Sequence, residues 1–416
     1  MGMGSLAFTE RCDVMNLKKS VRGCLIEDVV PTVCMLVITF VGLYLRYTPC
    51  DFLSQDMKRF LIPWFQTIKA NGGFLSLNQQ VGDYGLLYQT IIAAFSYTDV
   101  SPVYLYKALS ILFDFLLAGS TAYFISKTVT GKLCLHGIDY RKFLIYACVL
   151  LLPTVIMNSA FWGQCDSIYT FFLLWSLWFL YKEKYNLSFF LLGCSFAFKL
   201  QGIFLVPLFL FFCLHKKLSF SKFLITAFTF WFSGIIAYVY GRGLLDGFSV
   251  YLFQVGEYKR IWMNAPSFWF FFEENYEKYH ILAICLTFVI LTIVLLMLYK
   301  NCITISSFEQ IIVFALFIEW TCIIFLPSMH ERYTYVMDIL TLILAFLDKK
   351  FIKYAIITIG TSCLTYNTYL FIGNNTTLVF VILYCLFFFF YIVAWLHFTF
   401  FSSRLVRNSQ SGVSVG

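Results

Sequence analysis

Long apolar segments alternate with short polar ones along most of the chain. A transmembrane helix needs about 20 mainly apolar residues, so this pattern predicts an all-α polytopic membrane protein with about 12 transmembrane helices. The predicted spans lie near residues 29–45, 103–126, 143–161, 167–181, 187–198, 203–214, 219–240, 280–299, 307–326, 334–347, 354–372 and 378–400.

One pair of these segments allows two interpretations. Segments 187–198 and 203–214 are short, and the polar residues Lys199 and Gln201 lie between them, together with Gly202. They form either two short spans or one long span. The choice matters because it reverses the orientation of every later segment.

The distribution of basic residues favours two separate spans. With twelve spans and a cytoplasmic N-terminus, 19 of the 30 Lys and Arg residues lie on the inner side, as the positive-inside rule requires. One long span would instead place Lys349, Lys350 and Lys353 outside the membrane and Arg332 inside. We therefore predict that both termini are cytoplasmic.

The composition agrees with a membrane protein. The chain of 416 residues is 60% hydrophobic and 12% charged, with a mean hydropathy of +0.80, whereas soluble domains are about 45–50% apolar and about 25% charged. We expect one membrane domain over residues 29–400, between cytoplasmic tails at 1–28 and 401–416. The basic first tail lacks a cleavage site, which favours a retained first helix over a removed signal peptide.

Charge and cysteine usage narrow the function classes. The net charge of +8 follows the positive-inside distribution, so we expect membrane lipids and not nucleic acid as partners. The 14 Cys residues have no metal-ligand spacing and most lie in apolar runs, where Cys is usually a small buried side chain. We expect no disulfide framework, no metal, no other cofactor and a monomeric protein.

The first predicted outer segment, residues 46–102, holds an unusual concentration of polar residues. Its apolar positions within 60–68 are spaced for an amphipathic helix on the bilayer surface. The sequence Asn71-Gly72-Gly73 should end that helix. Residues 86–95 are too few to cross the bilayer, so they are predicted to form a second interfacial helix.

Three carboxylates in this segment are candidates for catalysis. Asp56 begins the predicted surface helix, where an aspartate can simply satisfy free backbone N–H groups; this explanation fits Asp51 better than Asp56. A carboxylate at the membrane boundary can also take the proton of an acceptor hydroxyl as a general base. We predict Asp56 as the base, with Asp51 and Asp83 as alternatives.

Other polar residues at predicted outer ends are candidates for substrate binding. Asp51 is one, and Gly82-Asp83-Tyr84 is either an ordinary turn or part of an acceptor site. Gln164 and Asp166 follow Trp162, a residue that by itself only indicates the membrane interface. Lys199 and Gln201 interrupt an apolar run; Lys199 either extends to the surface or meets an anion.

The sequence His330-Glu331-Arg332 is a candidate phosphate site. An arginine binds phosphate through two parallel hydrogen bonds, and the chain contains only 5 His. The alternative is an ion pair between Glu331 and Arg332 that fixes the end of a helix. We predict that His330 and Arg332 bind the phosphate of a donor.

Several of these motifs together resemble a known family. The segments SQDMKRFLIPWF, VGDY, FWGQCDSIY, FKLQGIFLVP and PSMHERYTY, spread over residues 46–335, resemble the multi-span glycosyltransferases of the GT-C fold, in the branch related to the second GPI mannosyltransferase. The chain differs at Gly85-Leu86-Leu87, where many relatives have an Asn or a Pro-Pro pair.

The resemblance implies an activity. Such enzymes transfer a sugar from a polyprenyl-phosphate carrier, with inversion and without a metal in many relatives, to a glycan, glycolipid or lipid-linked acceptor on the outer or lumenal face. An aspartate in the first outer loop acts as the base, which corresponds to Asp56. Outer basic residues hold the lipid phosphate, which corresponds to His330 and Arg332.

A transporter or lipid-linked-glycan flippase is the main alternative, since twelve spans with cytoplasmic ends also suit a transporter. A transporter predicts internal repeats and polar residues near the middle of the membrane, but here the polar clusters fall on one predicted face. A structural subunit of a glycan-assembly complex is a further alternative. Short loops and many Phe and Ile residues favour a bacterial plasma membrane over the endoplasmic reticulum, where sequons at Asn374 and Asn375 could be used.

Overall fold

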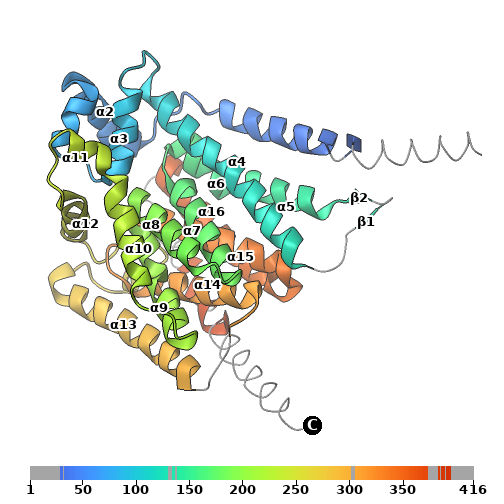
Figure 1. Ribbon diagram of the computed structural model, residues 1–416. Helices are drawn as coiled ribbons and strands as arrows, with labels where there is room; N and C mark the ends of the chain where they lie inside the picture. Colours follow the sequence, from blue (N-terminus) through green and yellow to red (C-terminus); the bar gives the residue numbers. More distant parts are fainter. Residues whose placement is uncertain are drawn as a thin grey trace, which may run out of the picture.

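A computed structural model describes residues 29–30, 32–129, 134–135, 138–300, 305–372, 383–384, 386–388 and 390–394. The two predicted tails, the sequons at Asn374 and Asn375, and much of the predicted last span lie outside these residues. The described chain consists of helices joined by turns and loops, with one antiparallel pair of two-residue strands, β1 (Cys134–Leu135) and β2 (Ile138–Asp139). The expectation of an all-α architecture is confirmed at this level (Figure 1).

Each of the first eleven predicted apolar segments is largely helical. The first is the helix Thr32–Tyr47. The α-helices that follow are α2 (Ile62–Ala70), α3 (Leu86–Phe95), α4 (Pro102–Thr128), α5 (Arg141–Leu150), α6 (Pro153–Ile156), α7 (Asp166–Tyr181), α8 (Tyr185–Phe198), α9 (Val206–His215), α10 (Lys222–Ser233), α11 (Ile235–Val239), α12 (Asp246–Glu257), α13 (Tyr276–Lys300), α14 (Phe308–Phe325), α15 (Tyr335–Leu347) and α16 (Ile352–Asn367).

Three described helices are long and apolar enough to cross a membrane, namely α4, α13 and α14. A fourth span results if the bent pair Arg141–Leu150 and Pro153–Trp162, with an angle of 47° between its parts, counts as one. These helices suit a helical membrane protein. The predicted number of twelve spans is not confirmed, because most of the other helices are shorter than a bilayer requires.

The chain reverses direction between α8 and α9. At the break, Lys199 has an extended backbone and binds Asp166 at the start of α7. At the other ends of these helices, Lys216 Nζ binds Glu183 Oε1 at 2.9 Å, and Glu183 lies in the turn between α7 and α8. Residues 187–214 therefore do not form one long helix, and the single-span alternative is wrong.

The first predicted outer segment forms a small helical cap at one end of the long helices (Figure 1). Both predicted helices are present, as α2 preceded by the π-helix η1 (Met57–Leu61), and as α3. Asn71 is the C-cap residue of α2, and Gly72 follows with a φ of 84°. This left-handed backbone is easily accessible only to glycine, which explains why the helix stops where the sequence predicted.

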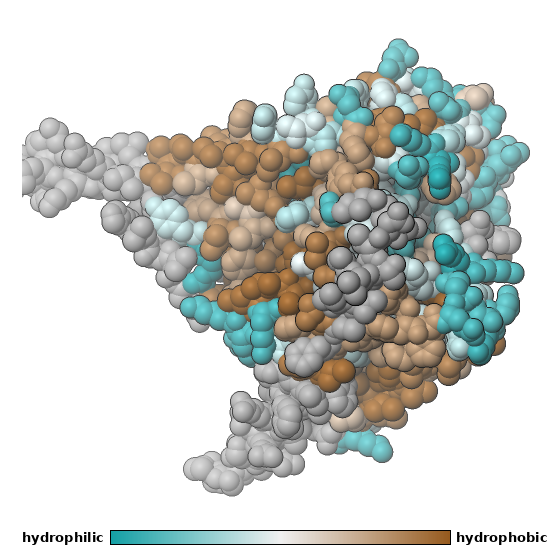
Figure 2. Space-filling view, turned by 180° about the vertical axis from the view of Figure 1, so that it is seen from behind, coloured by the Kyte–Doolittle hydropathy of each residue, from teal (hydrophilic) through white to brown (hydrophobic). Residues whose placement is uncertain are grey.

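Burial separates central from peripheral helices. Helix α14 is mostly buried, whereas α13 exposes most of its apolar surface. The helix Thr32–Tyr47 also presents bare apolar side chains, such as Leu36 and Phe40. Figure 2 shows apolar side chains over the left and centre of the rear face and hydrophilic ones along its right edge. Large exposed apolar surfaces of this kind fit contact with lipid.

Candidate functional site

Asp56 lies at the centre of a buried polar cluster assembled from four parts of the chain. Its Oδ2 accepts hydrogen bonds from Trp162 Nε1 and Gln164 Nε2, both at 2.9 Å, and from Arg332 Nη1 at 3.0 Å. Its Oδ1 accepts one from the Tyr369 hydroxyl at 2.9 Å. The aspartate is only 7% exposed, so these contacts hold a charge that water barely reaches.

The two carboxylate oxygens of Asp56 differ in how many further hydrogen bonds they can accept. A carboxylate offers about four lone-pair sites, and Oδ2 already receives three donors. Oδ1 receives only one described donor, the Tyr369 hydroxyl. A substrate hydroxyl that hydrogen-bonds to Asp56 would therefore bind at Oδ1, where it meets one described donor, the Tyr369 hydroxyl, and not three.

A tight turn places Trp162 and Gln164 on the same oxygen. Gly163, between them, has a φ of 72°, and a Cβ added there would approach Met57 Cε to 2.4 Å. The Ser54 hydroxyl donates to the Trp162 carbonyl at 3.1 Å. Only glycine fits this turn without strain, and the turn brings η3 (Met157–Trp162) against the start of η1.

A second charged centre lies beside the first. Lys199 Nζ binds Asp166 Oδ1, and Asn158 Nδ2 donates to Asp166 Oδ2 at 2.7 Å. The ammonium also lies 5.5 Å from the centre of the Tyr333 ring, and Arg332 lies 5.8 Å from the same ring. Lys199 is 6% exposed. It therefore meets an internal anion and does not extend to the membrane surface.

The turn Gly82-Asp83-Tyr84 connects to the cluster through two hydroxyl groups. The Tyr84 hydroxyl donates to Gln164 Oε1 at 2.9 Å, so Gln164 bridges Tyr84 and Asp56. The Tyr258 hydroxyl donates to Asp83 Oδ2 at 3.3 Å. Burial and the nearby Asp83 raise the pKa of Tyr258 to about 12, which keeps the phenol protonated as a donor.

His330 lies in surroundings that favour its neutral form. Its ring lies between the rings of Tyr258 and Tyr333, with centroids at 5.3 and 5.2 Å. Burial, and then the positive charges of Arg332 and Lys199, lower its pKa well below the usual 6.5. In the predicted phosphate site, the imidazole would thus contribute a hydrogen bond, and Arg332 the positive charge.

Arg332 forms an ion pair with Asp56. Among the described residues, no ion pair joins Arg332 to Glu331. The guanidinium also lies over the Trp162 ring at 5.7 Å. Its Nε is buried without a hydrogen-bond partner. The alternative in which Arg332 merely pairs with Glu331 is therefore not supported, and a donor N–H remains open for an anion.

The structure leaves two predicted site residues outside the cluster. Asp51 is exposed, and its described contact is a hydrogen bond from the Tyr104 hydroxyl at 2.5 Å. Gln201 lies in η4 (Leu200–Leu205), and its buried Oε1 has no hydrogen-bond partner. Asp56, Asp83, Tyr84, Gln164, Asp166, Lys199, His330 and Arg332 are linked through the contacts above.

Sequence reasoning missed Tyr369 and Asn158. Tyr369 lies in η8 (Thr368–Ile372), at the end of a predicted span, and Asn158 lies in η3. Both are inside apolar runs, where a single hydroxyl or amide gives no pattern. Asn158 precedes Asp166 by eight residues in the sequence, and this short separation was the one available signal of their hydrogen bond.

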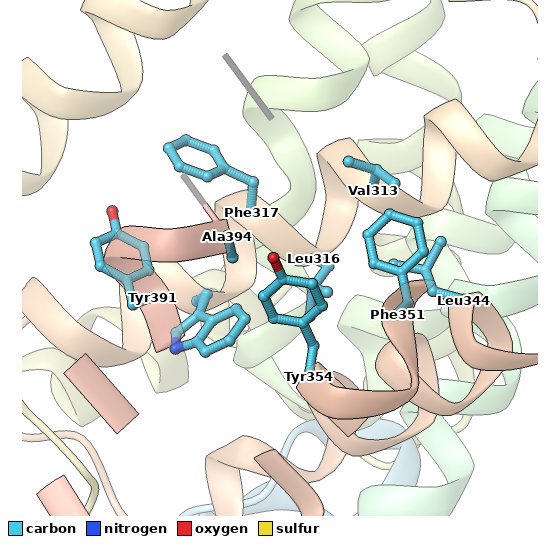
Figure 3. A pocket seen from close by; sticks show the side chains of 9 residues that line it. Val313, Leu316, Phe317, Leu344, Phe351, Tyr354, Tyr391 and Ala394 are labelled. Carbon is cyan, nitrogen blue, oxygen red and sulfur yellow. The ribbon is translucent and has the colours of Figure 1, made fainter. Parts of the chain in front are cut away.

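The possible metal ligands among the described residues and one pocket of the structure bear on other possible sites. None of the groups of His, Cys, Asp and Glu in the described residues could hold a metal ion. An apolar pocket lies between α14, α15 and α16 (Figure 3). It is lined by Val313, Leu316, Phe317, Trp320, Leu344, Phe351, Tyr354, Tyr391 and Ala394, none of which belongs to the Asp56 cluster.

Comparison with known proteins adds no assignment. No protein-family model matches the chain, and no curated protein matches it either. The resemblance to GT-C glycosyltransferases therefore stays a prediction from the motifs.

Proposed function

We propose that the protein is an inverting glycosyltransferase that moves a hexose from a polyprenyl-phosphate carrier to a glycan, glycolipid or lipid-linked acceptor. One observation carries the proposal: a buried carboxylate, Asp56, forms an ion pair with an arginine, Arg332, from a segment 276 residues away. Glycosyl transfer from a phosphate needs a base for the acceptor and a positive charge for the leaving group. The pair supplies both within one cluster.

Each residue has a role in this reaction. Arg332 binds the donor phosphate through the N–H groups that Asp56 does not use, and neutral His330 adds a hydrogen bond. The acceptor hydroxyl oxygen attacks the anomeric carbon, and the bond from that carbon to the phosphate oxygen breaks. The polyprenyl phosphate leaves with the bonding electrons, and the acceptor proton passes to Asp56.

A lipid-linked donor fits the chain better than a nucleotide sugar. The sequence has no Walker motif and no GxGxxG motif, which are common ways of binding nucleotide phosphates. The helix Thr32–Tyr47 and α13 instead present large apolar surfaces. A polyprenyl chain can lie along such a surface while its phosphate reaches Arg332.

The test is consumption of defined donors by the purified full-length protein. Synthetic polyprenyl-phosphate mannose, glucose, galactose and N-acetylglucosamine are supplied, with nucleotide-activated forms of the same sugars as the control. The proposal predicts that one lipid donor is consumed and releases polyprenyl phosphate, while the nucleotide sugars persist. Failure with all four lipid donors would favour a transporter, and flux assays would follow.

A further inference from the structure

Three π-helical segments occur in the described chain, and each contains or directly follows a residue of the Asp56 cluster. Asp56 immediately precedes η1, Trp162 is the last residue of η3, and Tyr369 is the second residue of η8. A π-helical turn is rare and is frequent at functional sites. Here all three such turns converge on a single carboxylate.

Aromatic packing fixes these segments to one another. Phe52, Phe161 and Phe371 form a triad with ring centroids 5.3–5.5 Å apart. Phe161 belongs to η3, Phe371 to η8, and Phe52 lies just before η1. The Tyr369 ring stacks on Trp162 at 4.9 Å and 19°. The position of the Tyr369 hydroxyl on Asp56 Oδ1 is therefore set by packing as well as by its hydrogen bond.

Tyr369 also lies on the accessible side of the carboxylate. Trp162 and Gln164 are buried, at 0% and 2% exposure, whereas Tyr369 is only half-buried. Trp162 and Gln164 thus form the inner wall of the cluster, whereas Arg332, the third donor on Oδ2, is partly exposed like Tyr369. A small group that approaches Asp56 Oδ1 from outside meets the Tyr369 hydroxyl first.

We propose that Asp56 Oδ1 is the subsite for the hydroxyl group of the sugar acceptor, and that the Tyr369 hydroxyl occupies this subsite until the acceptor arrives. This inference rests on the function proposed above. The acceptor O–H replaces the phenol O–H as donor to Oδ1, and the acceptor oxygen then attacks the anomeric carbon. The acceptor proton ends on Oδ1, and the phosphate leaves with the electrons of the broken bond. While Tyr369 is in place, water is kept from Oδ1 and the donor is not hydrolysed.

The test is donor hydrolysis without any added acceptor. The substitution Tyr369→Phe keeps the ring on Trp162 but removes the hydroxyl, so water can enter the subsite. A hydrogen bond to a charged group is strong enough for its loss to raise the rate of hydrolysis by roughly tenfold. The KM for the lipid donor should change little, because the described hydrogen bond of the Tyr369 hydroxyl is to Asp56 and not to His330 or Arg332.

A matched control exists on the surface of the protein. The Tyr104 hydroxyl donates to the exposed carboxylate Asp51, so Tyr104→Phe removes the same kind of hydrogen bond away from the cluster. Its hydrolysis rate should equal that of the wild type. If Tyr369 only supports the fold, Tyr369→Phe would instead lower hydrolysis and raise the donor KM, and the inference would be overturned.

Two further outcomes separate this inference from the proposed function. A wild type that consumes no lipid donor contradicts the function itself. A wild type that consumes a donor, with unchanged hydrolysis in Tyr369→Phe, contradicts only the subsite. If Tyr369→Phe does not fold, replacing Tyr369 by 3-fluorotyrosine keeps the shape and strengthens the hydrogen bond, so hydrolysis should then fall; a rise would contradict the subsite.

Discussion

Glu331 is a fully buried carboxyl next in sequence to Arg332, so its ionisation bears on the candidate site. Burial raises its pKa to about 7, against the opposing effect of the Arg332 charge. In the unfolded chain a glutamate titrates near its ordinary value of about 4.3. The folded protein therefore keeps a proton on Glu331 between these values, and the unfolded chain does not.

This difference in proton binding fixes the direction in which stability changes with pH. Where the folded state binds more protons, stability falls as pH rises. Stability from Glu331 is complete below the unfolded pKa and is lost as the pH rises toward about 7. The melting temperature of Glu331→Gln, measured in detergent, should therefore fall less between pH 5 and pH 8 than that of the wild type. The exposed Glu277→Gln serves as the control. An unchanged pH dependence in Glu331→Gln would show that the carboxyl is ionised throughout.

At the scale of elements, one buried ion pair joins the first helix to the bundle. Arg46, at the end of the helix Thr32–Tyr47, places Nε 2.8 Å from Asp114 Oδ2 on α4. Its Nη2 donates to the Leu150 carbonyl at the end of α5, at 2.9 Å. Ser159 completes the group by donating to Asp114 at 2.5 Å. These contacts are structural, and none of them reaches Asp56.

Removing one partner of the Arg46–Asp114 ion pair should destabilise the protein. Asp114→Ala leaves the Arg46 charge buried, which typically destabilises a protein by about 3–5 kcal/mol. The double variant Arg46→Met/Asp114→Leu removes both charges and should recover most of that loss. The free energy of unfolding in mixed micelles measures both effects. Asp99→Ala, which removes an exposed partner of Lys69, should change nothing. A double variant no more stable than Asp114→Ala would contradict the argument.

At the scale of the whole molecule, predicted outer connections meet at one end and predicted inner ones at the other. Asp166 and Lys199 join at the candidate site, whereas Glu183 and Lys216 join at the far end. Lys350 binds Glu309 at 3.4 Å, which brings the starts of α14 and α16 together. Each of these three ion pairs joins helix ends that the distribution of basic residues predicts to lie on the same side of the membrane.

Which end faces outward can be measured. The positive-inside rule predicts that Ser101, at the start of α4, is outside and that Lys217 is inside. In intact cells, a membrane-impermeant maleimide should label Ser101→Cys above the wild-type background and label Lys217→Cys only after permeabilisation. The opposite pattern would place the Asp56 cluster on the cytoplasmic side.

The sequence predicted much of this arrangement because polar residues are rare in it. In a chain with 12% charged residues, Asp56, Gln164 and Arg332 stood out at predicted outer ends, and the structure brings them together. Tyr369 could not be predicted, since 27 Tyr residues lie mostly in apolar surroundings. Its hydrogen bond to Asp56 comes from the π-helical segment η8, which no sequence pattern indicates. Asp51 stayed an alternative base from the sequence, and in the structure it is exposed and outside the Asp56 cluster.

The most direct test compares these two carboxylates in one assay. Asp56→Asn and Asp51→Asn are isosteric changes in the same loop, and transfer from the consumed lipid donor is measured for both. A lost general base typically costs about 10²–10⁴-fold in rate. If Asp56 is the base, Asp56→Asn should show that loss and Asp51→Asn nearly wild-type transfer. Equal activity of the two variants, or loss in Asp51→Asn alone, would contradict the assignment of Asp56 as the base.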